Sequence, residues 1–158
     1  MVPPWPWKIV MISAKGWPSN ARIFEDDRLT ILVFPEGDLK AIVKRSGTQR
    51  GTLMLLPSKE KNGKIDIREL LVKLASLGVT KLLVEGGGEL AWSFLEAGCV
   101  DRAYWILAPK VFGGRDAKTS VEGLGVGSPD QAFQFHPGKV VRSGDDWIFE
   151  GVFSKNRA

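Results

Sequence analysis

The stretch Lys81–Ala91, KLLVEGGGELA, decides how the rest of the chain is interpreted. Its apolar run Leu82–Val84 ends at the carboxylate of Glu85, and three glycines follow before an amphipathic segment begins. Glycine lets an anion approach the free N–H groups of a helix N-terminus, because no Cβ stands in the way. The stretch is therefore either a nucleotide cradle or a tight connection between a strand and a helix, and its local features leave both interpretations open.

A dinucleotide-binding motif can be traced in the same stretch. Gly86, Gly88 and Ala91 match the spacing G-x-G-x-x-G/A of Rossmann domains. In those domains the motif opens the first βαβ unit, and an acidic residue ends the next strand about 20 residues later. Here the motif lies past the middle of the chain, and Asp101 comes before its strand instead of after it. On its own the match is a weak argument.

The residues before this stretch alternate between strand and helix patterns. Short apolar runs predict strands, and apolar residues at helical spacing predict helices, over five segments: strands at Lys8–Ser13, Thr30–Phe34 and Thr52–Leu56, and helices at Asp38–Arg45 and Ile65–Leu77. A further strand at Leu82–Val84 would complete a right-handed crossover with parallel strands. Glu85 and the glycines would then lie beyond the carboxyl end of a strand, where open parallel sheets bind their ligands.

The residues after this stretch predict one helix and then several strands. The helix is expected from Glu89 to Glu96, because apolar residues form one face there and Gly98 follows. Strands are expected at four places: Ala103–Ala108, Gln131–Phe135, Lys139–Arg142 and Trp147–Phe153. Gly144 and Asp145 predict a hairpin between the last two. The sequence thus predicts an α/β protein with a mostly parallel sheet and antiparallel strands at its C-terminal end.

Length and composition limit the class of protein. The 158 residues, 44% hydrophobic and 25% charged, fit one domain over residues 1–158 with its core in residues 8–153. The apolar runs are far shorter than the roughly 20 residues of a membrane span, and the first ten residues lack a signal-peptide pattern. We therefore expect a cytoplasmic protein that does not contact membranes. One cysteine and one histidine exclude an internal disulfide and make a metal site a poor hypothesis.

The charge pattern permits an anionic partner. The net charge is +4 and the pI is about 9.3. The basic residues are scattered among acidic ones, a pattern typical of a solvated surface, although a phosphorylated small molecule needs only a few of them. The sequence has no recognisable nucleic-acid-binding motif and no basic stripe with exposed aromatics, so we do not expect nucleic-acid binding.

Three segments in the same order resemble a known family. They are KIVMISAKGWPSNARIF at 8–24, VTKLLVEGGGELAWSFLEAGCVDRAYWILAPKVFGG at 79–114 and VVRSGDDWIFEGVF at 140–153. They resemble the reductase domain of bacterial bifunctional riboflavin-biosynthesis proteins and its stand-alone relatives. The resemblance implies a dihydrofolate-reductase-like three-layer α/β/α fold and a homodimer. It also implies NADPH-dependent reduction of 5-amino-6-(5-phosphoribosylamino)uracil, a phosphorylated pyrimidine, to its ribitylamino product.

The resemblance also implies roles for individual residues. Glu85 matches the glutamate that contacts the substrate, and its carboxylate can accept hydrogen bonds from ring or amine N–H groups. The residues that match cofactor contacts are Ser13, Gly87, Gly88, Glu89, Leu90, Ala91, Trp92 and Ser93. A hydroxyl at Ser13, near Lys15, can bind a ribose or a 2′-phosphate. The catalytic residues stay unknown. Since the cofactor carries the hydride, the protein's share of the catalysis is mainly to hold nicotinamide C4 against the substrate carbon.

The sequence also departs from the family pattern. The family's reductase domain normally begins roughly 60 to 70 residues earlier, with an S-x-D-G-like strand that lies centrally in the sheet, and Ile12 stands where the family has Asp. The zinc deaminase half is absent as well. Two hypotheses therefore remain: a reductase, or a non-catalytic or partner-completed remnant that binds nucleotide or forms an assembly interface. An unpaired sheet edge favours association with another chain under either hypothesis.

Overall fold

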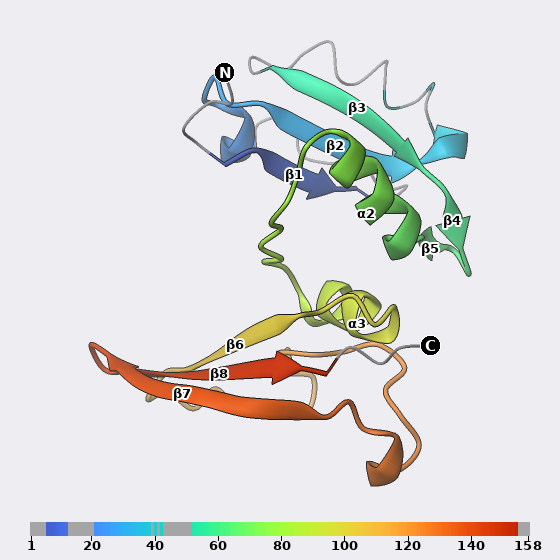
Figure 1. Ribbon diagram of the computed structural model, residues 1–158. Helices are drawn as coiled ribbons and strands as arrows, with labels where there is room; N and C mark the ends of the chain where they lie inside the picture. Colours follow the sequence, from blue (N-terminus) through green and yellow to red (C-terminus); the bar gives the residue numbers. More distant parts are fainter. Residues whose placement is uncertain (1–5, 13–20, 39, 41, 43–51, 155–158) are drawn as a thin grey trace. The chain divides into compact units, whose positions relative to one another are not determined.

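The computed structural model describes residues 6–12, 21–38, 40, 42 and 52–154 (Figure 1). The chain divides into two compact units, residues 1–78 and residues 79–158. The prediction of a single domain over residues 1–158 stays a prediction. The first unit contains β1 (Lys8–Met11), β2 (Thr30–Pro35), β3 (Leu53–Ser58), β4 (Glu60–Lys61), β5 (Lys64–Ile65) and α2 (Ile67–Ser76). The second contains α3 (Gly88–Glu96), β6 (Arg102–Leu107), β7 (Phe135–Ser143) and β8 (Asp146–Phe153).

The first unit is built on a parallel sheet in the order β1-β2-β3. Val10 pairs with Leu32, and Leu32 with Leu55, which confirms the three strands predicted before Lys59. The central strand β2 is a continuous apolar run, Ile31–Phe34, with 0% exposure, as expected for a strand of a parallel sheet covered on both faces. Ile12, which follows β1, is buried in a core cluster with Phe24, Leu32, Phe34 and Ile42.

Helix α2 begins where its sequence provides a cap. The Asp66 carboxylate accepts hydrogen bonds from the N–H groups of Arg68 and Glu69, at 3.0 and 3.2 Å, and so satisfies two donors that the helix cannot pair. Ile67, Leu70 and Leu74 form its buried face. The helix confirms the element predicted over Ile65–Leu77, shortened by two residues at its start and one at its end.

A short hairpin precedes α2 and was not predicted. β4 and β5 pair antiparallel around Asn62 and Gly63, whose φ angles are 54° and 73°. Asn-Gly is a strong signal for this type of two-residue hairpin turn, because both central residues need positive φ. The dipeptide was therefore the signal that could have predicted the hairpin.

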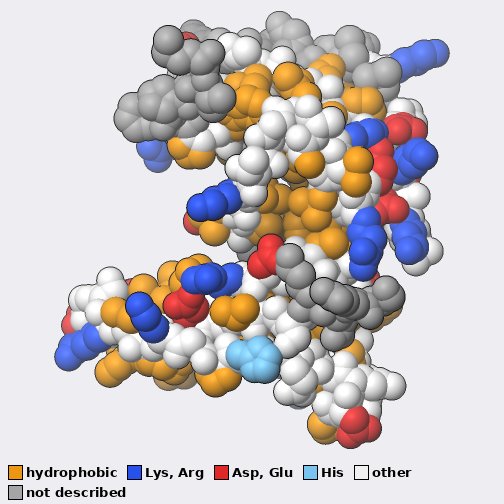
Figure 2. All heavy atoms as spheres, viewed as in Figure 1, with side chains coloured by type: hydrophobic (Ala, Val, Ile, Leu, Met, Phe, Trp, Pro, Cys, Tyr) orange, Lys and Arg blue, Asp and Glu red, His pale blue; other side chains and the backbone are white. Residues whose placement is uncertain are grey.

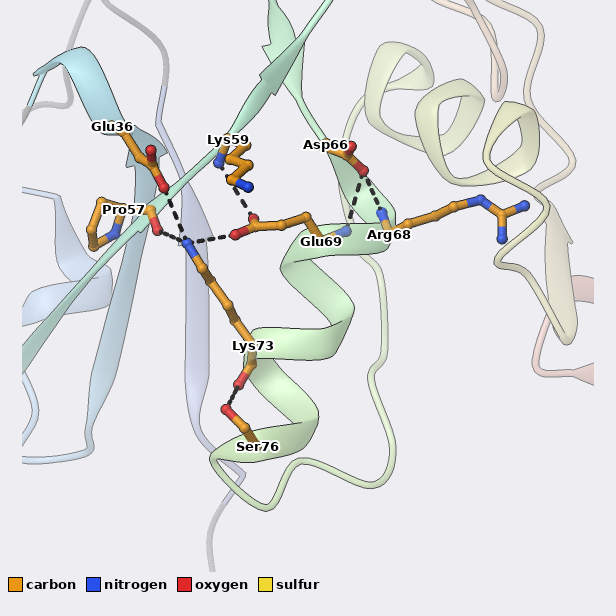
Figure 3. Close-up of polar contacts among 8 residues, drawn as sticks. All are labelled: Glu36, Pro57, Lys59, Asp66, Arg68, Glu69, Lys73 and Ser76. Atoms are coloured by element: carbon orange, nitrogen blue, oxygen red, sulfur yellow. Dashed lines mark hydrogen bonds and ion pairs between the residues drawn. The ribbon is translucent and has the colours of Figure 1, made fainter.

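Lys73 ties α2 to the strand ends of the first unit (Figure 3). Its ammonium group donates to the Pro57 carbonyl at 2.6 Å and pairs with Glu69 at 2.6 Å, one helical turn back. Glu36, which follows β2, contacts the same ammonium group at 3.4 Å. Glu69 holds the pKa of Lys73 above its ordinary value, with Glu36 adding to the effect. These contacts link the ends of β2 and β3 to the helix.

The second unit contains an antiparallel sheet in the order β6-β8-β7. Trp105 pairs with Phe149, and Val140 pairs with Phe149 from the other side. Gly144, with a φ of 61°, forms the predicted turn between β7 and β8. The strand predicted at Gln131–Phe135 is wrong, because Pro129–Gln131 forms a 3-10 turn and β7 begins only at Phe135. Proline has a fixed φ that suits the first turn of a helix.

Two other predictions need correction or fall outside the described residues. Residues 82–84 form no strand; residues 79–87 contain neither helix nor strand, and Leu83 is 75% exposed. A strand exists through hydrogen bonds to a neighbouring strand, and within the described residues no strand pairs with residues 82–84, so an apolar sequence alone was insufficient. The predicted crossover through α2 is therefore not formed. Of the helix predicted at Asp38–Arg45, residues 40 and 42 are helical, Asp38 belongs to a 3-10 turn and the remainder lies outside the described residues.

Candidate functional site

The start of α3 has no side-chain cap. Gly87 is its N-cap residue, with an extended backbone and no side-chain hydrogen bond to the helix. In α2, by contrast, Asp66 binds two N–H groups of the first turn. The first turn of any helix carries unpaired N–H groups and a partial positive charge. The start of α3 is therefore the helix end that a negatively charged ligand could complete.

The three glycines before and within α3 differ in what surrounds them. A Cβ on Gly87 would have nothing within 4 Å, and the φ of Gly87 is −72°, so neither packing nor backbone conformation requires glycine there. The three atoms nearest to a Cβ on Gly86 would all belong to the side chain of Leu90, the closest at 2.8 Å. Gly86 and Gly87 are both exposed. Open backbone at these two positions is the property that a cradle for a phosphate needs.

Position 88 requires glycine because it packs against a later segment of the chain, a contact that was not predicted from the sequence. A Cβ on Gly88 would lie 2.6 Å from the Glu122 nitrogen. Gly123, which follows Glu122, has a φ of 82°. It lies against Trp92, so a Cβ on Gly123 would be 2.3 Å from the indole ring. Glu122 in turn pairs with Lys118 at 3.5 Å. Glu122 and Gly123 therefore cover part of the first turns of α3, and the glycine-rich run VEGLGVG was the signal for such close packing.

Of the residues predicted to contact the cofactor, those on α3 are in very different environments. Trp92 is 7% exposed, and its ring meets Phe133 edge to face at 5.7 Å. The Ser93 hydroxyl donates to the Glu89 carbonyl at 2.9 Å, within the helix. Glu89 is exposed, and Leu90 and Ala91 are half-buried. The structure thus brings Gly87–Ser93 together on one helix, and Trp92 has a clear packing role there.

The remaining predicted site residues lie elsewhere. Glu85 is exposed and stands three residues before α3, in the segment without helix or strand. Ser13 lies outside the described residues. Ile12, at the position where the family carries Asp, is 6% exposed and part of the apolar core of the first unit. An aspartate there would be buried among apolar side chains, so isoleucine suits this position.

Neither a metal centre nor a membrane-spanning helix is found among the described residues. In the part of the chain that the structure describes, no group of three or more His, Cys, Asp or Glu side chains is arranged to hold a metal ion. Within those same residues, no helix combines the length and hydrophobicity that crossing a bilayer requires.

Comparisons with known proteins agree with the resemblance. The family model of the RibD C-terminal domain matches residues 4–149. The riboflavin biosynthesis protein RibD of Actinobacillus pleuropneumoniae is 37% identical over 98 residues, which cover 62% of this chain and 26% of that protein. The 2,5-diamino-6-ribosylamino-4(3H)-pyrimidinone 5′-phosphate reductase of Methanothermobacter thermautotrophicus is 29% identical over 154 residues, 92% of this chain and 65% of that protein. The chain therefore spans less than two thirds of either relative.

Solved structures show the same fold. Acinetobacter baumannii RibD superposes with a TM-score of 0.74 at 17% sequence identity, covering 92% of this chain and 37% of that one. A pyrimidine reductase-like protein from Corynebacterium diphtheriae superposes with a TM-score of 0.66 at 15% identity, covering 96% of this chain and 62% of that one. These similarities confirm the predicted α/β reductase fold. Because the family model matches nearly the whole chain, this protein belongs to the RibD C-terminal domain family.

Proposed function

We propose that this protein is a reductase of riboflavin biosynthesis that uses NADPH to reduce a phosphorylated ribosylamino-pyrimidine to its ribitylamino product. Membership of the RibD C-terminal domain family supports the reaction class, and a relative that this chain matches over 92% of its length is a pyrimidinone 5′-phosphate reductase. The single structural observation that carries the proposal is the open, uncapped start of α3 at Gly86 and Gly87.

The start of α3 fits an anionic cofactor. Gly87 has no Cβ and open space beside it, so a phosphate can reach the backbone N–H groups of the first turn. When bound, NADPH supplies the hydride. The chain's own residues would hold the nucleotide through the backbone at Gly87 and Gly88, and residues 118–123 would fix the position of that first turn. Trp92 contributes by packing beneath the turn, against Gly123 and Phe133.

Glu85 is the residue that we assign to the substrate. Its exposed carboxylate lies one residue before the glycines, so a substrate held by it would lie next to a nucleotide at α3. A carboxylate accepts hydrogen bonds and donates none when ionised, which suits the ring and amine N–H groups of an aminopyrimidine. Both 5-amino-6-(5-phosphoribosylamino)uracil and the diamino-pyrimidinone in the name of the Methanothermobacter relative present such groups. We take the uracil compound as the substrate, NADPH as the cofactor, and a cytoplasmic homodimer as the working form.

Binding of NADPH can be tested with a variant that separates folding from ligand binding. Gly87→Asp places a carboxylate at the N-cap, where Asp is among the best residues for helix stability. The same carboxylate repels a phosphate at the first turn. We therefore expect a fully folded variant whose affinity for NADPH, measured by quenching of tryptophan fluorescence, is at least about tenfold weaker, a difference of about 1.4 kcal/mol.

The matched control is Gly37→Asp, which adds the same charge at another glycine where a Cβ would have nothing within 4 Å. It should bind NADPH as the unmodified chain does. Equal affinity in the two variants, or no saturable binding at millimolar NADPH, would argue against the proposed site. Saturable binding without turnover would instead favour the non-catalytic remnant.

A further inference from the structure

The start of α3 is surrounded by acidic residues. Glu85 lies one residue before the glycines, and Glu89 is the second residue of the helix. Glu122, from a later segment, packs against Gly88. Ionised carboxylates repel a phosphate at short range, and the N-terminus of a helix supplies only about half a positive charge. A phosphate-containing ligand at this turn therefore needs a cation beside it.

Lys118 is the cation that the structure links to this turn. Its ammonium group pairs with the Glu122 carboxylate at 3.5 Å, and the Glu122 Cγ would be 2.5 Å from a Cβ on Gly88. Through these two contacts the Lys118 ammonium group lies within about 10 Å of the Gly88 Cα. The Lys118 side chain is 89% exposed, and its flexible stem lets the ammonium group turn from Glu122 towards an anion at the first turn.

The segment that carries Lys118 is attached to α3. Gly123 lies so close to Trp92 that a Cβ on Gly123 would be 2.3 Å from the indole ring. Between these residues and Lys118, the Thr119 hydroxyl donates to the Val121 carbonyl at 2.8 Å. These contacts hold the backbone near the helix and leave the Lys118 side chain open to solvent.

Two other cations of the second unit have partners on the sheet. Arg102 pairs with Glu150, and Arg142 pairs with Asp145 at the turn after β7. Figure 2 shows Lys and Arg side chains interspersed with Asp and Glu side chains on the visible face. The net charge of +4 thus gives a diffuse attraction for anions, screened beyond about 8 Å at physiological ionic strength. Lys118 differs because its contacts lead to the first turn of α3.

We propose that Lys118 is a cofactor-binding residue that contacts the diphosphate of a nicotinamide dinucleotide held at the start of α3. The inference rests on the proposed function and adds the side chain that neutralises the ligand. In the free chain Glu122 holds Lys118 beside the site. On binding, the ammonium group donates to the phosphate oxygens in charge-assisted hydrogen bonds. NADPH and NADH share the diphosphate, so Lys118 acts on both alike.

Lys118→Met tests this contact, with Lys139→Met as the matched control. Met keeps most of the apolar stem and loses the charge. Lys139 is also exposed, but it lies on β7, at the opposite edge of the sheet from β6. Titrations followed by tryptophan fluorescence should give a Kd about 5- to 20-fold higher for both NADPH and NADH in Lys118→Met. Lys139→Met should stay within about twofold of the unmodified chain, and the loss in Lys118→Met should shrink in about 0.5 M NaCl.

Glu122→Gln should have the opposite effect. The amide keeps the size of the side chain and its packing against Gly88, but it removes the charge that holds Lys118 and repels the phosphate. Both cofactors should therefore bind about two- to fivefold more tightly. If the pair with Lys118 served only to stabilise the segment, both variants would change the affinity in the same direction. The result for Glu122→Gln tests the proposal by itself if Lys118→Met fails to fold.

Three results would overturn the proposal. Equal losses in Lys118→Met and Lys139→Met would leave Lys118 only its share of the net charge. A loss confined to NADPH would place Lys118 at the 2′-phosphate instead of the diphosphate. Weaker binding by Glu122→Gln would assign the ion pair to structure. All three leave the proposed function standing, whereas the absence of saturable binding of either cofactor to the unmodified chain would overturn both.

Discussion

Glu122 lies against Gly88 so closely that a Cβ on residue 88 would be 2.5 Å from the Glu122 Cγ and 2.6 Å from its backbone nitrogen. Real Cβ atoms do not approach other atoms at such distances, so the first residue of α3 has to be glycine while Glu122 keeps its position. The glycine at 88 is thus explained by packing, whereas the glycine at 87 is not.

Gly88→Ala should therefore destabilise the protein and disturb the start of α3. The added methyl group forces either Glu122 or the helix to move, and overpacking of this kind typically costs about 1 to 3 kcal/mol. Urea denaturation should show a lower midpoint, and the affinity for NADPH should fall with it. Gly87→Ala is the control. Its added methyl group has nothing within 4 Å, so the variant should lose only about 0.5 to 1 kcal/mol, because Ala is a poorer N-cap than Gly.

Lys73→Met should weaken the attachment of α2 to the sheet of the first unit. The variant keeps most of the apolar stem but loses the hydrogen bond to Pro57 and the ion pairs with Glu69 and Glu36. Hydrogen bonds from charged groups contribute more than neutral ones, and partial exposure reduces their value, so we expect a loss of about 1 to 2 kcal/mol. Lys61→Met, at an exposed lysine on β4, should change the urea midpoint little; equal losses in both variants would contradict the assigned role of Lys73.

Asp26 should make the stability of the protein sensitive to acid. Its carboxylate accepts from the Arg28 guanidinium at 2.6 and 2.9 Å and from the Lys8 ammonium at 2.6 Å, which holds the pKa of Asp26 well below its usual range. In the unfolded chain the pKa of Asp26 is about 3.8. Below this pH the unfolded chain binds a proton at Asp26 while the folded chain keeps the carboxylate ionised, so the stabilisation by Asp26 declines as the pH falls.

The comparison with Asp26→Asn tests this contribution. The difference in urea midpoint between the unmodified chain and the variant should be constant above about pH 5 and should shrink towards pH 2, because a protonated aspartate resembles asparagine. A difference that stays the same across this pH range would show that the two cations do not act on Asp26 as described.

Much of the first unit could be predicted from the sequence, for a physical reason. Ile31–Phe34 is apolar at every position, and the structure buries all four residues, as expected for the central strand of a parallel sheet. The start of α2 could also be predicted, because the apolar spacing and the N-cap residue Asp66 indicate nearly the same first residue. At β2 and α2 the apolar pattern of the sequence matches the burial of the same residues in the fold.

Predictions from the sequence were wrong or incomplete where an element depends on contacts with residues that are distant along the chain. Leu82–Val84 has the composition of a strand, but a strand needs a neighbour, and none of the described residues provides one. The contact of Glu122 with Gly88 joins residues 34 positions apart, which no periodicity could reveal. Trp92 was predicted to contact a cofactor from its place in a motif, and the structure adds a packing role against Gly123 and Phe133.

Glu85→Gln should separate substrate recognition from cofactor binding. The amide keeps the size of the side chain but replaces one acceptor oxygen with a donor, which is mismatched to an N–H group of the pyrimidine. We expect NADPH affinity to stay unchanged while kcat/KM falls about 10- to 100-fold, corresponding to about 1.4 to 2.7 kcal/mol of transition-state stabilisation. A variant that loses NADPH affinity as well would place Glu85 in the cofactor site instead.

The most direct test of the reductase function is transfer of hydride from NADPH to the substrate. The protein is incubated with NADPH carrying deuterium at nicotinamide C4 and with 5-amino-6-(5-phosphoribosylamino)uracil, and the product is followed by mass spectrometry alongside the absorbance of NADPH. The proposed function predicts one NADPH oxidised per ribitylamino product formed, with deuterium in that product. Saturable NADPH binding with no product and no NADPH oxidation would contradict it.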